Sequence, residues 1–167
     1  MRDAPQVKPP PIASSITRSP GLIRPSATAT VGRGQTAGIG FWSNRNGQAL
    51  IRALNGGGAS TLLGDWLAAT FPNLFGTSSG ASNLAGKDNG QVAAFYQSRF
   101  VLKGEKVDAQ VLATALAVYV TSTALNPSGV GTQYGFIISG DGAGTATFNV
   151  GSDGDAFGAA NNSVLTV

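Results

Sequence analysis

The sequence predicts an α+β fold: about four helices, one of them central and apolar, with a short β segment before them and a β-hairpin after them. Two observations predict this fold. Apolar residues recur at helical spacing through the middle of the chain, and apolar and small polar residues alternate at both ends. A chain of 167 residues, 42% of them hydrophobic, is long enough to bury one core. We therefore expect one domain preceded by a tail.

The first 33 residues differ in composition from the rest of the chain. Six of the eight prolines lie within residues 1–26. Residues 1–33 contain five basic residues and one acid, Asp3, which gives them a net charge of +4. The basic residues are Arg2, Lys8, Arg18, Arg24 and Arg33. Such a segment favours extended conformations and does not fold alone. Residues 1–33 are therefore predicted to be a Pro-rich basic linker or arm. We expect no nucleic acid partner, because the charges are sparse and have no aromatic residues between them.

The residues after this arm predict a short N-terminal β segment. Ala27–Val31 and Thr36–Phe41 each alternate small polar and apolar residues, with Gly32 and Gly34 between the two runs. Two alternating runs around glycines are typical of a hairpin or an edge strand. We expect a single α+β module over residues 34–167.

Residues 49–71 predict the first two helices. The first stops at the run Asn55-Gly56-Gly57-Gly58, which is a strong helix-ending signal. The second begins at Ser60 or Thr61, and Pro72 ends it. Its apolar face consists of Leu62, Leu63, Trp66, Leu67 and Phe71. We expect this face to be buried in the core.

Two further helices follow. Asp88 and Gln91 have the spacing of a capping box, which predicts a third helix to about Lys103. The fourth, over residues 108–125, is apolar nearly all round. Polar residues interrupt it, and it is shorter than the ~20 apolar residues that a bilayer requires. We therefore expect a central buried helix and no membrane span.

Alternation returns beyond Pro127 and predicts a C-terminal β-hairpin over residues 133–150. Glycines at 140, 142 and 144 mark its turn. The alternating apolar residues are Tyr134, Phe136 and Ile138 before the turn, and Ala146, Phe148 and Val150 after it. The apolar end, Val164–Val167, is expected either to add a strand or to pack against the core.

The absence of certain residue types excludes several kinds of catalysis. The chain has no histidine and no cysteine, so Ser-His-Asp and Cys-His machinery and His- or Cys-ligated zinc are excluded within one subunit. Residues 76–80 match G-x-S-x-G, but no strand precedes them. Residues 80–88 resemble a phosphate loop with the wrong glycine spacing. We expect a protein that is not an enzyme and has no cofactor.

Three acids near the C-terminus raise the question of calcium. Asp141, Asp153 and Asp155 lie in Gly-rich stretches, where flexible backbone and carboxylates can surround a hard cation. An EF-hand starting at Asp153 would need oxygen ligands where Phe157 and Val164 stand. Aspartates in turns commonly accept hydrogen bonds from nearby backbone amides, and we favour that role. We predict no metal site here, with calcium as the alternative.

The stretch "GFWSNRNGQALI" at residues 40–51 has two interpretations. In the first, a strand ending in Phe41 and Trp42 turns into a helix that an asparagine caps, and Trp42 is a buried anchor. In the second, the stretch is a surface for a glycan or a protein, because sugars are bound by aromatic stacking and amide hydrogen bonds. The candidate contact residues are Trp42, Asn44, Arg45 and Gln48.

Four blocks of sequence carry a family resemblance: "GQTAGIGFWSNRNGQALIRALNGG", "LGDWLAATFPNLFG", "LAGKDNGQVAAFYQSRF" and "DAQVLATALAVYVT". In this order they resemble a module of large bacterial secreted or cell-surface multidomain proteins. That module follows serine-aspartate-repeat B-type β-sandwich repeats and a Pro-rich linker. The resemblance covers roughly residues 34–167 and implies an extracellular or cell-surface location, but it transfers no site residues. It also implies a further helix after "ANNSVLTV", which favours a module truncated at its C-terminus.

These observations predict a non-catalytic extracellular structural or interaction module of a bacterial surface or matrix protein. Its expected partners are other domains of the same polypeptide or copies of itself, together with a glycan if the second interpretation of residues 40–51 holds. The alternative is a self-assembling subunit of an extracellular fibre or layer. In that case the N-terminal arm contacts neighbouring copies, and uncharged strands with open edges pair between them.

Overall fold

The computed structural model describes residues 34–104, 106–140 and 142–166. Its α-helices are α1 (Ile39–Ser43), α2 (Arg45–Ala53), α3 (Leu62–Thr70), α4 (Pro72–Phe75), α5 (Asn89–Phe100) and α6 (Val107–Thr121). The 3₁₀ helices are η1 (Leu54–Gly56), η2 (Gly80–Ser82), η3 (Val130–Tyr134), η4 (Gly142–Thr145) and η5 (Gly154–Phe157). The strands are β1 (Thr147–Asn149) and β2 (Val164–Thr166). The predicted arm, residues 1–33, lies outside the described residues.

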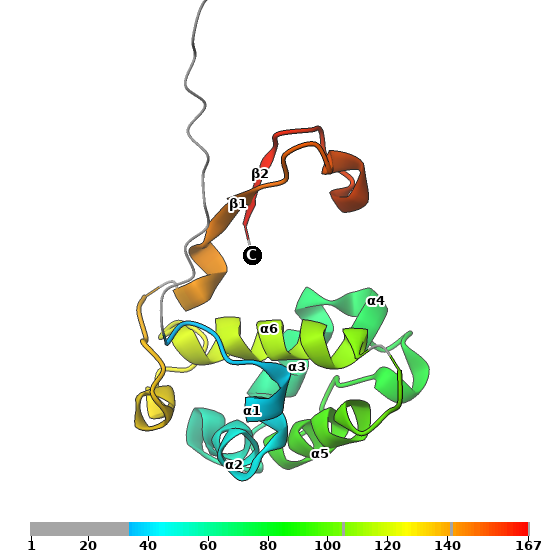
Figure 1. Cartoon of the computed structure of the whole chain (residues 1–167). Helices are drawn as coiled ribbons and strands as arrows, with labels where there is room; N and C mark the ends of the chain where they lie inside the picture. The colour runs from blue at the N-terminus through cyan, green and yellow to red at the C-terminus, as the bar shows by residue number, and fades with distance from the viewer. Residues whose placement is uncertain (1–33, 105, 141, 167) are drawn as a thin grey trace, which may run out of the picture.

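Helix α6 runs across the helical body, with α1, α2 and α5 on one side and α3 and α4 on another (Figure 1). Its apolar character on most sides reflects this position, since Leu112, Leu116 and Val120 are fully buried. The core also takes buried side chains from every other α-helix, among them Trp42, Leu50, Ile51, Leu63, Leu67, Phe75, Val92 and Tyr96. No helix in the described ranges is long and apolar enough to cross a membrane.

Helix α6 ends at Thr121, four residues earlier than the predicted 108–125 segment. The Thr121 hydroxyl donates to the Ala117 carbonyl at 2.7 Å and accepts from the Ala143 amide at 2.8 Å. The Thr121 carbonyl accepts from the Ser139 amide. The backbone groups that would continue the helix are therefore used by the segment after it, which crosses back over the end of α6.

The predicted N-terminal β segment is wrong for the residues that can be checked. Residues 39–43 form helix α1, whereas residues 27–33 lie outside the described residues. Ala37 lies just before α1 and Phe41 lies within it. Both side chains pack against the helical core. A helix satisfies its own backbone, which a strand without a neighbour cannot do.

The predicted hairpin over residues 133–150 is also wrong. Residues 130–134 and 142–145 form 3₁₀ helices η3 and η4 instead. Phe136 is not in a strand, because its ring is buried in the helical core. The centre of this ring lies 5.6 Å from that of Phe41 and 5.5 Å from that of Trp42. Burial in the helical core therefore outweighs the local alternation. The fold is mostly helical, not the α+β arrangement that the sequence predicts.

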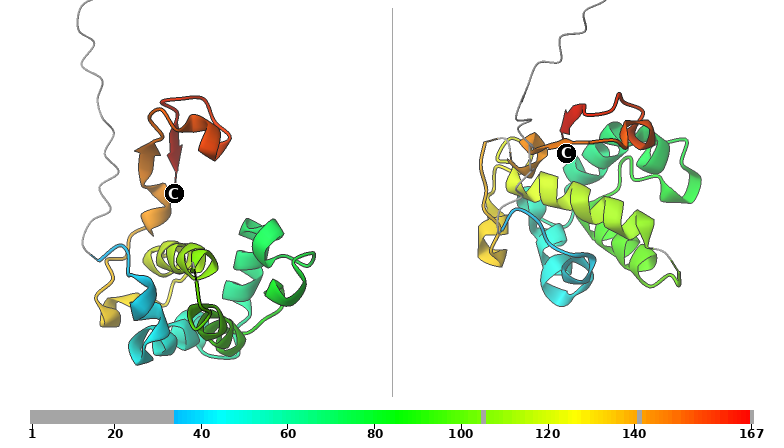
Figure 2. Two further views of the ribbon diagram at one scale, coloured as in Figure 1. Left: turned by 45° about the vertical axis from the view of Figure 1, so that its right-hand side comes forward. Right: turned by 45° about the horizontal axis from the view of Figure 1, so that its top comes forward.

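The chain end forms a two-stranded antiparallel ribbon that extends away from the helical body (Figures 1 and 2). Thr147 pairs with Thr166, and Asn149 pairs with Val164. Residues 164–166 thus take the first of the two expected arrangements, an added strand. Figure 2 shows this ribbon and η5 lying on the α6 side of the body.

Candidate binding groove

The four residues predicted to contact a ligand lie around the corner between α1 and α2, but three of them make contacts within the fold: Trp42, Asn44 and Gln48. Trp42 has no exposed surface, and its Nε1 donates to the Ala37 carbonyl at 3.2 Å. Gln48 is 8% exposed, and its Nε2 donates to the Trp42 carbonyl at 2.9 Å. The Trp42 ring therefore offers no face on which a sugar could stack.

The other two residues, Asn44 and Arg45, are exposed on this corner. The Asn44 Oδ1 accepts from the amides of Asn46 and Gly47 at 2.8 and 3.0 Å, which is the N-cap of α2. The corner joins two helices rather than a strand and a helix. A contact through Arg45 stays a prediction.

A second feature, which the sequence did not single out, is a groove between α3–α4 on one side and α6 on the other. Three neighbouring hollows of about 480, 370 and 230 Å³ make it up, because Trp66 lines the first two and Val111 lines the last two. We call it the α3–α6 groove. Its lining residues include Leu62, Trp66, Phe71, Leu74, Val107, Val111, Thr114, Val118, Tyr119 and Gly144.

Helical spacing explains why these residues share one groove. On α6, Val107, Val111 and Ala115 recur every four residues, and Thr114 and Val118 form a parallel row. Side chains four apart lie above one another on a helix, so α6 presents a continuous apolar stripe. On α3, Leu62 and Trp66 have the same spacing and form the opposite wall.

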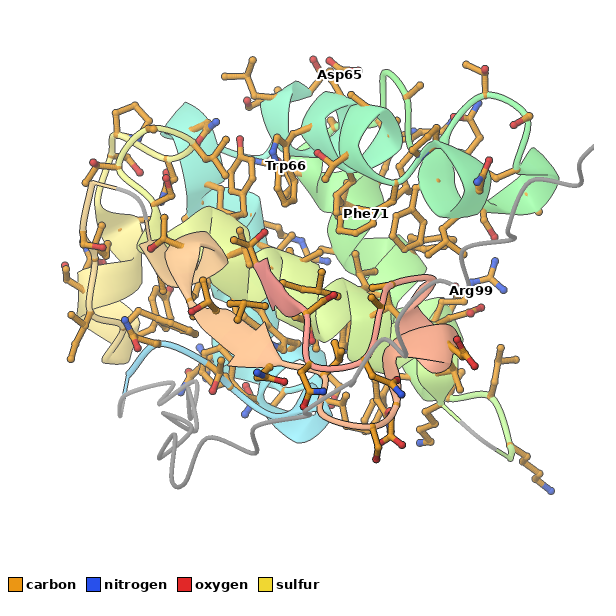
Figure 3. All side chains as sticks on the ribbon, turned by 90° about the horizontal axis from the view of Figure 1, so that it is seen from above. Asp65, Trp66, Phe71 and Arg99 are labelled. Atoms are coloured by element: carbon orange, nitrogen blue, oxygen red, sulfur yellow. The ribbon has the colours of Figure 1, made fainter. Side chains whose placement is uncertain are left out.

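An aromatic row follows the α3–α4 wall of the groove. Ring centroids lie 5.1 Å apart for Tyr119 and Trp66, and 6.1 Å apart for Trp66 and Phe71. The row continues to Phe75, Phe95 and the Arg99 guanidinium, which lies 4.7 Å above the Phe95 ring. Figure 3 shows Trp66 and Phe71 near one another on the α6 side of α3, with Asp65 pointing away. These edge-to-face contacts hold the rings in fixed orientations.

One end of the groove has a polar floor. Asn55, in a left-handed conformation at φ 50°, donates from Nδ2 to the Tyr119 hydroxyl at 2.6 Å and to the Leu125 carbonyl at 3.2 Å. Burial raises the pKa of Tyr119, and the hydrogen bond from Asn55 partly opposes this rise. Tyr119 is therefore a neutral phenol near neutral pH, with a proton to donate.

Two donors at this end have no acceptor in the part of the chain that the structure describes. They are the Trp66 indole N–H and the Tyr119 hydroxyl. Trp66 is only half-buried, so its ring can meet a ligand. The groove thus combines aromatic faces, small side chains and hydrogen-bond donors, which are the features of sites for extended peptides.

The surroundings of the groove carry negative charge. Residues 107–167 contain four acids and no lysine or arginine, a net charge of −4. Asp108 lines the groove near Leu74, and Asp153 and Asp155 are exposed in the segment that lies on the α6 side. The described residues contain no group of three His, Cys, Asp or Glu side chains that could hold a metal. Asp141, the third acid of the calcium alternative, lies outside them.

No protein-family model, curated protein or solved structure matches this chain. The function has to be inferred from the chemistry of the groove. Sequence reasoning placed Trp66 in the core because it belongs to the apolar face of its helix. The apolar face of α3 is two rows wide: Leu63 and Leu67 form one row, and Leu62 and Trp66 form the other. A single neighbouring helix does not cover both rows, so the width of this face could have indicated an open groove.

Proposed function

We propose that this chain is a non-catalytic interaction module of a bacterial extracellular or cell-surface protein, and that the α3–α6 groove binds an extended, uncharged peptide segment. The family resemblance supports the location. The groove supports the binding role, because its walls are mostly apolar and one end has free polar groups. These are two donors, the Trp66 N–H and the Tyr119 O–H, and one buried acceptor, the Asn55 Oδ1. A peptide in an extended conformation offers both apolar side chains and carbonyl acceptors.

The main support for this proposal is the exposed apolar surface along the groove. Leu62, Leu74 and Val107 line it and are 58, 44 and 53% exposed. Covering apolar surface yields roughly 25 cal/mol for each Å² removed from water. Large apolar side chains gathered along one groove are therefore typical of a surface that is covered in the assembled state.

A second candidate function, self-assembly into a fibre or layer, is favoured by the terminal ribbon. In the described ranges β1 and β2 pair only with each other, so both outer edges have backbone groups available for pairing. Val164, at the start of β2, is 55% exposed. Unprotected edges of this kind pair with further strands. Self-assembly predicts a mass that grows with concentration, which sedimentation velocity measures.

The groove proposal can be tested with a fluorescein-labelled octaproline peptide, which is uncharged, extended and free of backbone N–H donors along its proline run. Fluorescence anisotropy should show saturable binding to the full chain. Thr114→Phe, which places a ring on the exposed α6 wall of the groove, should weaken binding at least tenfold. Ala49→Phe adds the same ring at an exposed position of α2, which lines none of the three hollows, and should bind as the parent does. Equal binding by the two variants would contradict the proposal.

A further inference from the structure

We infer that the occupant of the α3–α6 groove is this chain's own N-terminal arm, with residues 5–12 lying across Trp66 and Phe71. This inference rests on the proposed function, because it assigns the ligand of the same groove. Three independent properties of the molecule lead to it: the chemistry of the segment, the distribution of charge, and the length of chain between this segment and the helical body.

The chemistry of residues 5–12, "PQVKPPPI", matches the groove. Four of these eight residues are prolines, which keep the segment extended and provide carbonyl acceptors without N–H donors. The groove offers the complement: the faces of Trp66 and Phe71 for proline rings, and the Trp66 N–H and Tyr119 O–H for carbonyls. Aromatic grooves with such donors are the usual receptors of polyproline segments.

The charges of the two parts are opposite. Residues 1–33 carry +4, and residues 107–167, which supply the α6 wall of the groove and the segment above it, carry −4. Lys8 lies within the proline run, and Asp108 lies at the groove end near Leu74. Opposite charges attract over about 10 Å at 0.1 M salt. The basic residue nearest to Asp108 in the sequence is Lys106, and its Nζ donates to the Phe100 carbonyl and lies 4.1 Å from the centre of the Phe100 ring.

The arm is long enough to reach the groove from the place where it joins the body, near the C-terminal end of α6 and on the α1 side of that helix (Figure 2). The Gly34 carbonyl accepts from the Ile137 amide at 2.7 Å, and Ser139 in turn pairs with the end of α6. The chain from Gly34 back to Ile12 can extend up to roughly 70 Å, whereas α6 is only about 22 Å long. A tether of this reach keeps its ligand at an effective concentration in the millimolar range. Binding of the arm of the same chain is therefore favoured over binding of the arm of a second copy.

Fluorine NMR of the full chain labelled with 5-fluorotryptophan tests this inference. The chain has two tryptophans, so two resonances are expected, and Trp66→Phe assigns them. The triple variant Pro9→Ser, Pro10→Ser and Pro11→Ser should release the arm. Its Trp66 resonance should shift and become more sensitive to solvent, while the buried Trp42 resonance stays in place. The matched control Pro20→Ser with Pro25→Ser removes prolines outside the docked segment and should leave both resonances unchanged.

Octaproline binding distinguishes failure of the arm-docking inference from failure of the proposed function of the groove. If the arm occupies the groove, the triple variant should bind octaproline at least tenfold more tightly than the parent chain. An unchanged Trp66 resonance together with unchanged octaproline binding would overturn the inference and leave the proposed function standing. Loss of binding in every variant would overturn both. A Trp66 shift that accompanies dissociation of a dimer in sedimentation velocity would show that a neighbouring copy supplies the arm, and would overturn the intrachain assignment.

Discussion

At the scale of single residues, the corner between α1 and α2 depends on close backbone contact. A Cβ atom at Gly47 would lie 2.2 Å from the Phe41 carbonyl oxygen and 2.5 Å from the Trp42 Cα. Both obstacles are backbone atoms, so neither can rotate away. Glycine at this position lets α2 begin directly against α1, and this contact keeps Trp42 fully buried.

Gly47→Ala should therefore destabilise the fold by about 1–3 kcal/mol, the usual cost of overpacking a tight site. Gly40→Ala is the matched control in the preceding helix, because a Cβ atom there meets nothing within 4 Å. The control should be neutral or slightly stabilising, since alanine favours helix more than glycine does. Urea denaturation of the two variants gives both values. Equal stabilities would show that the corner can relax.

Tyr96 links the stability of the fold to alkaline pH. Burial raises the pKa of Tyr96 from 10.0 to about 12, and its hydroxyl donates to the Ile39 carbonyl at 3.0 Å. The unfolded chain loses this proton near pH 10 and the folded chain only near pH 12. The contribution of Tyr96 is therefore complete below pH 10 and is lost as the pH rises from 10 to 12.

The free energy of unfolding should accordingly fall more steeply between pH 10 and 12 in the parent chain than in Tyr96→Phe. Lysine side chains titrate in the same range in both proteins, so only the difference between the two slopes reports on Tyr96. Chemical denaturation at pH 9, 10, 11 and 12 measures it. Parallel slopes would mean that the phenol ionises in the folded chain as easily as in the unfolded one.

At the scale of secondary-structure elements, helix starts and stops are the most local features. In the capping box at the start of α5, Asp88 Oδ1 accepts from the Gln91 amide at 2.7 Å and Gln91 Oε1 accepts from the Asp88 amide at 3.0 Å. The run from Asn55 to Gly58 follows the end of α2, with Asn55 and Gly57 in positive-φ conformations. Both features need only neighbouring residues.

Asp88→Ala should lower stability by about 1 kcal/mol, because it leaves a helix amide without its acceptor. Asp108→Ala is a suitable control, since Asp108 lies in the first turn of α6 but is not its N-cap residue. The control should cost a few tenths of a kcal/mol through the helix dipole alone. Thermal unfolding of both variants compares the two effects, and an equal loss would argue against a specific cap.

The local nature of these signals explains what the sequence could predict. The capping box is confirmed, and the apolar segment that begins near residue 108 does form a helix. The β predictions failed at Ala37, Phe41 and Phe136. These side chains pack against core residues that are distant in the sequence, and a local alternation of apolar and polar residues does not distinguish such packing from a strand. The groove escaped prediction for the same reason: whether Trp66 is covered depends on where α6 and the chain end lie, and no local pattern encodes that.

At the scale of the whole molecule, the charge divides the chain into three zones. Residues 1–33 carry +4, residues 34–106 carry +3 and residues 107–167 carry −4. The acidic zone comprises α6 and the ribbon on its side of the body (Figure 2). The groove thus has apolar walls, one acid at its end, Asp108, and further acids in the segment above it. This arrangement selects an apolar, basic segment, and the chain carries such a segment at its own N-terminus.

The binding role of the groove is tested most directly by titrating octaproline into the fluorotryptophan-labelled Pro9→Ser, Pro10→Ser, Pro11→Ser variant. In this variant the groove is free of its proposed occupant, and the two tryptophans report on the groove and on the core at once. We expect the Trp66 resonance to shift saturably with octaproline while the Trp42 resonance stays fixed. A Trp66 resonance that does not move at any octaproline concentration would contradict it.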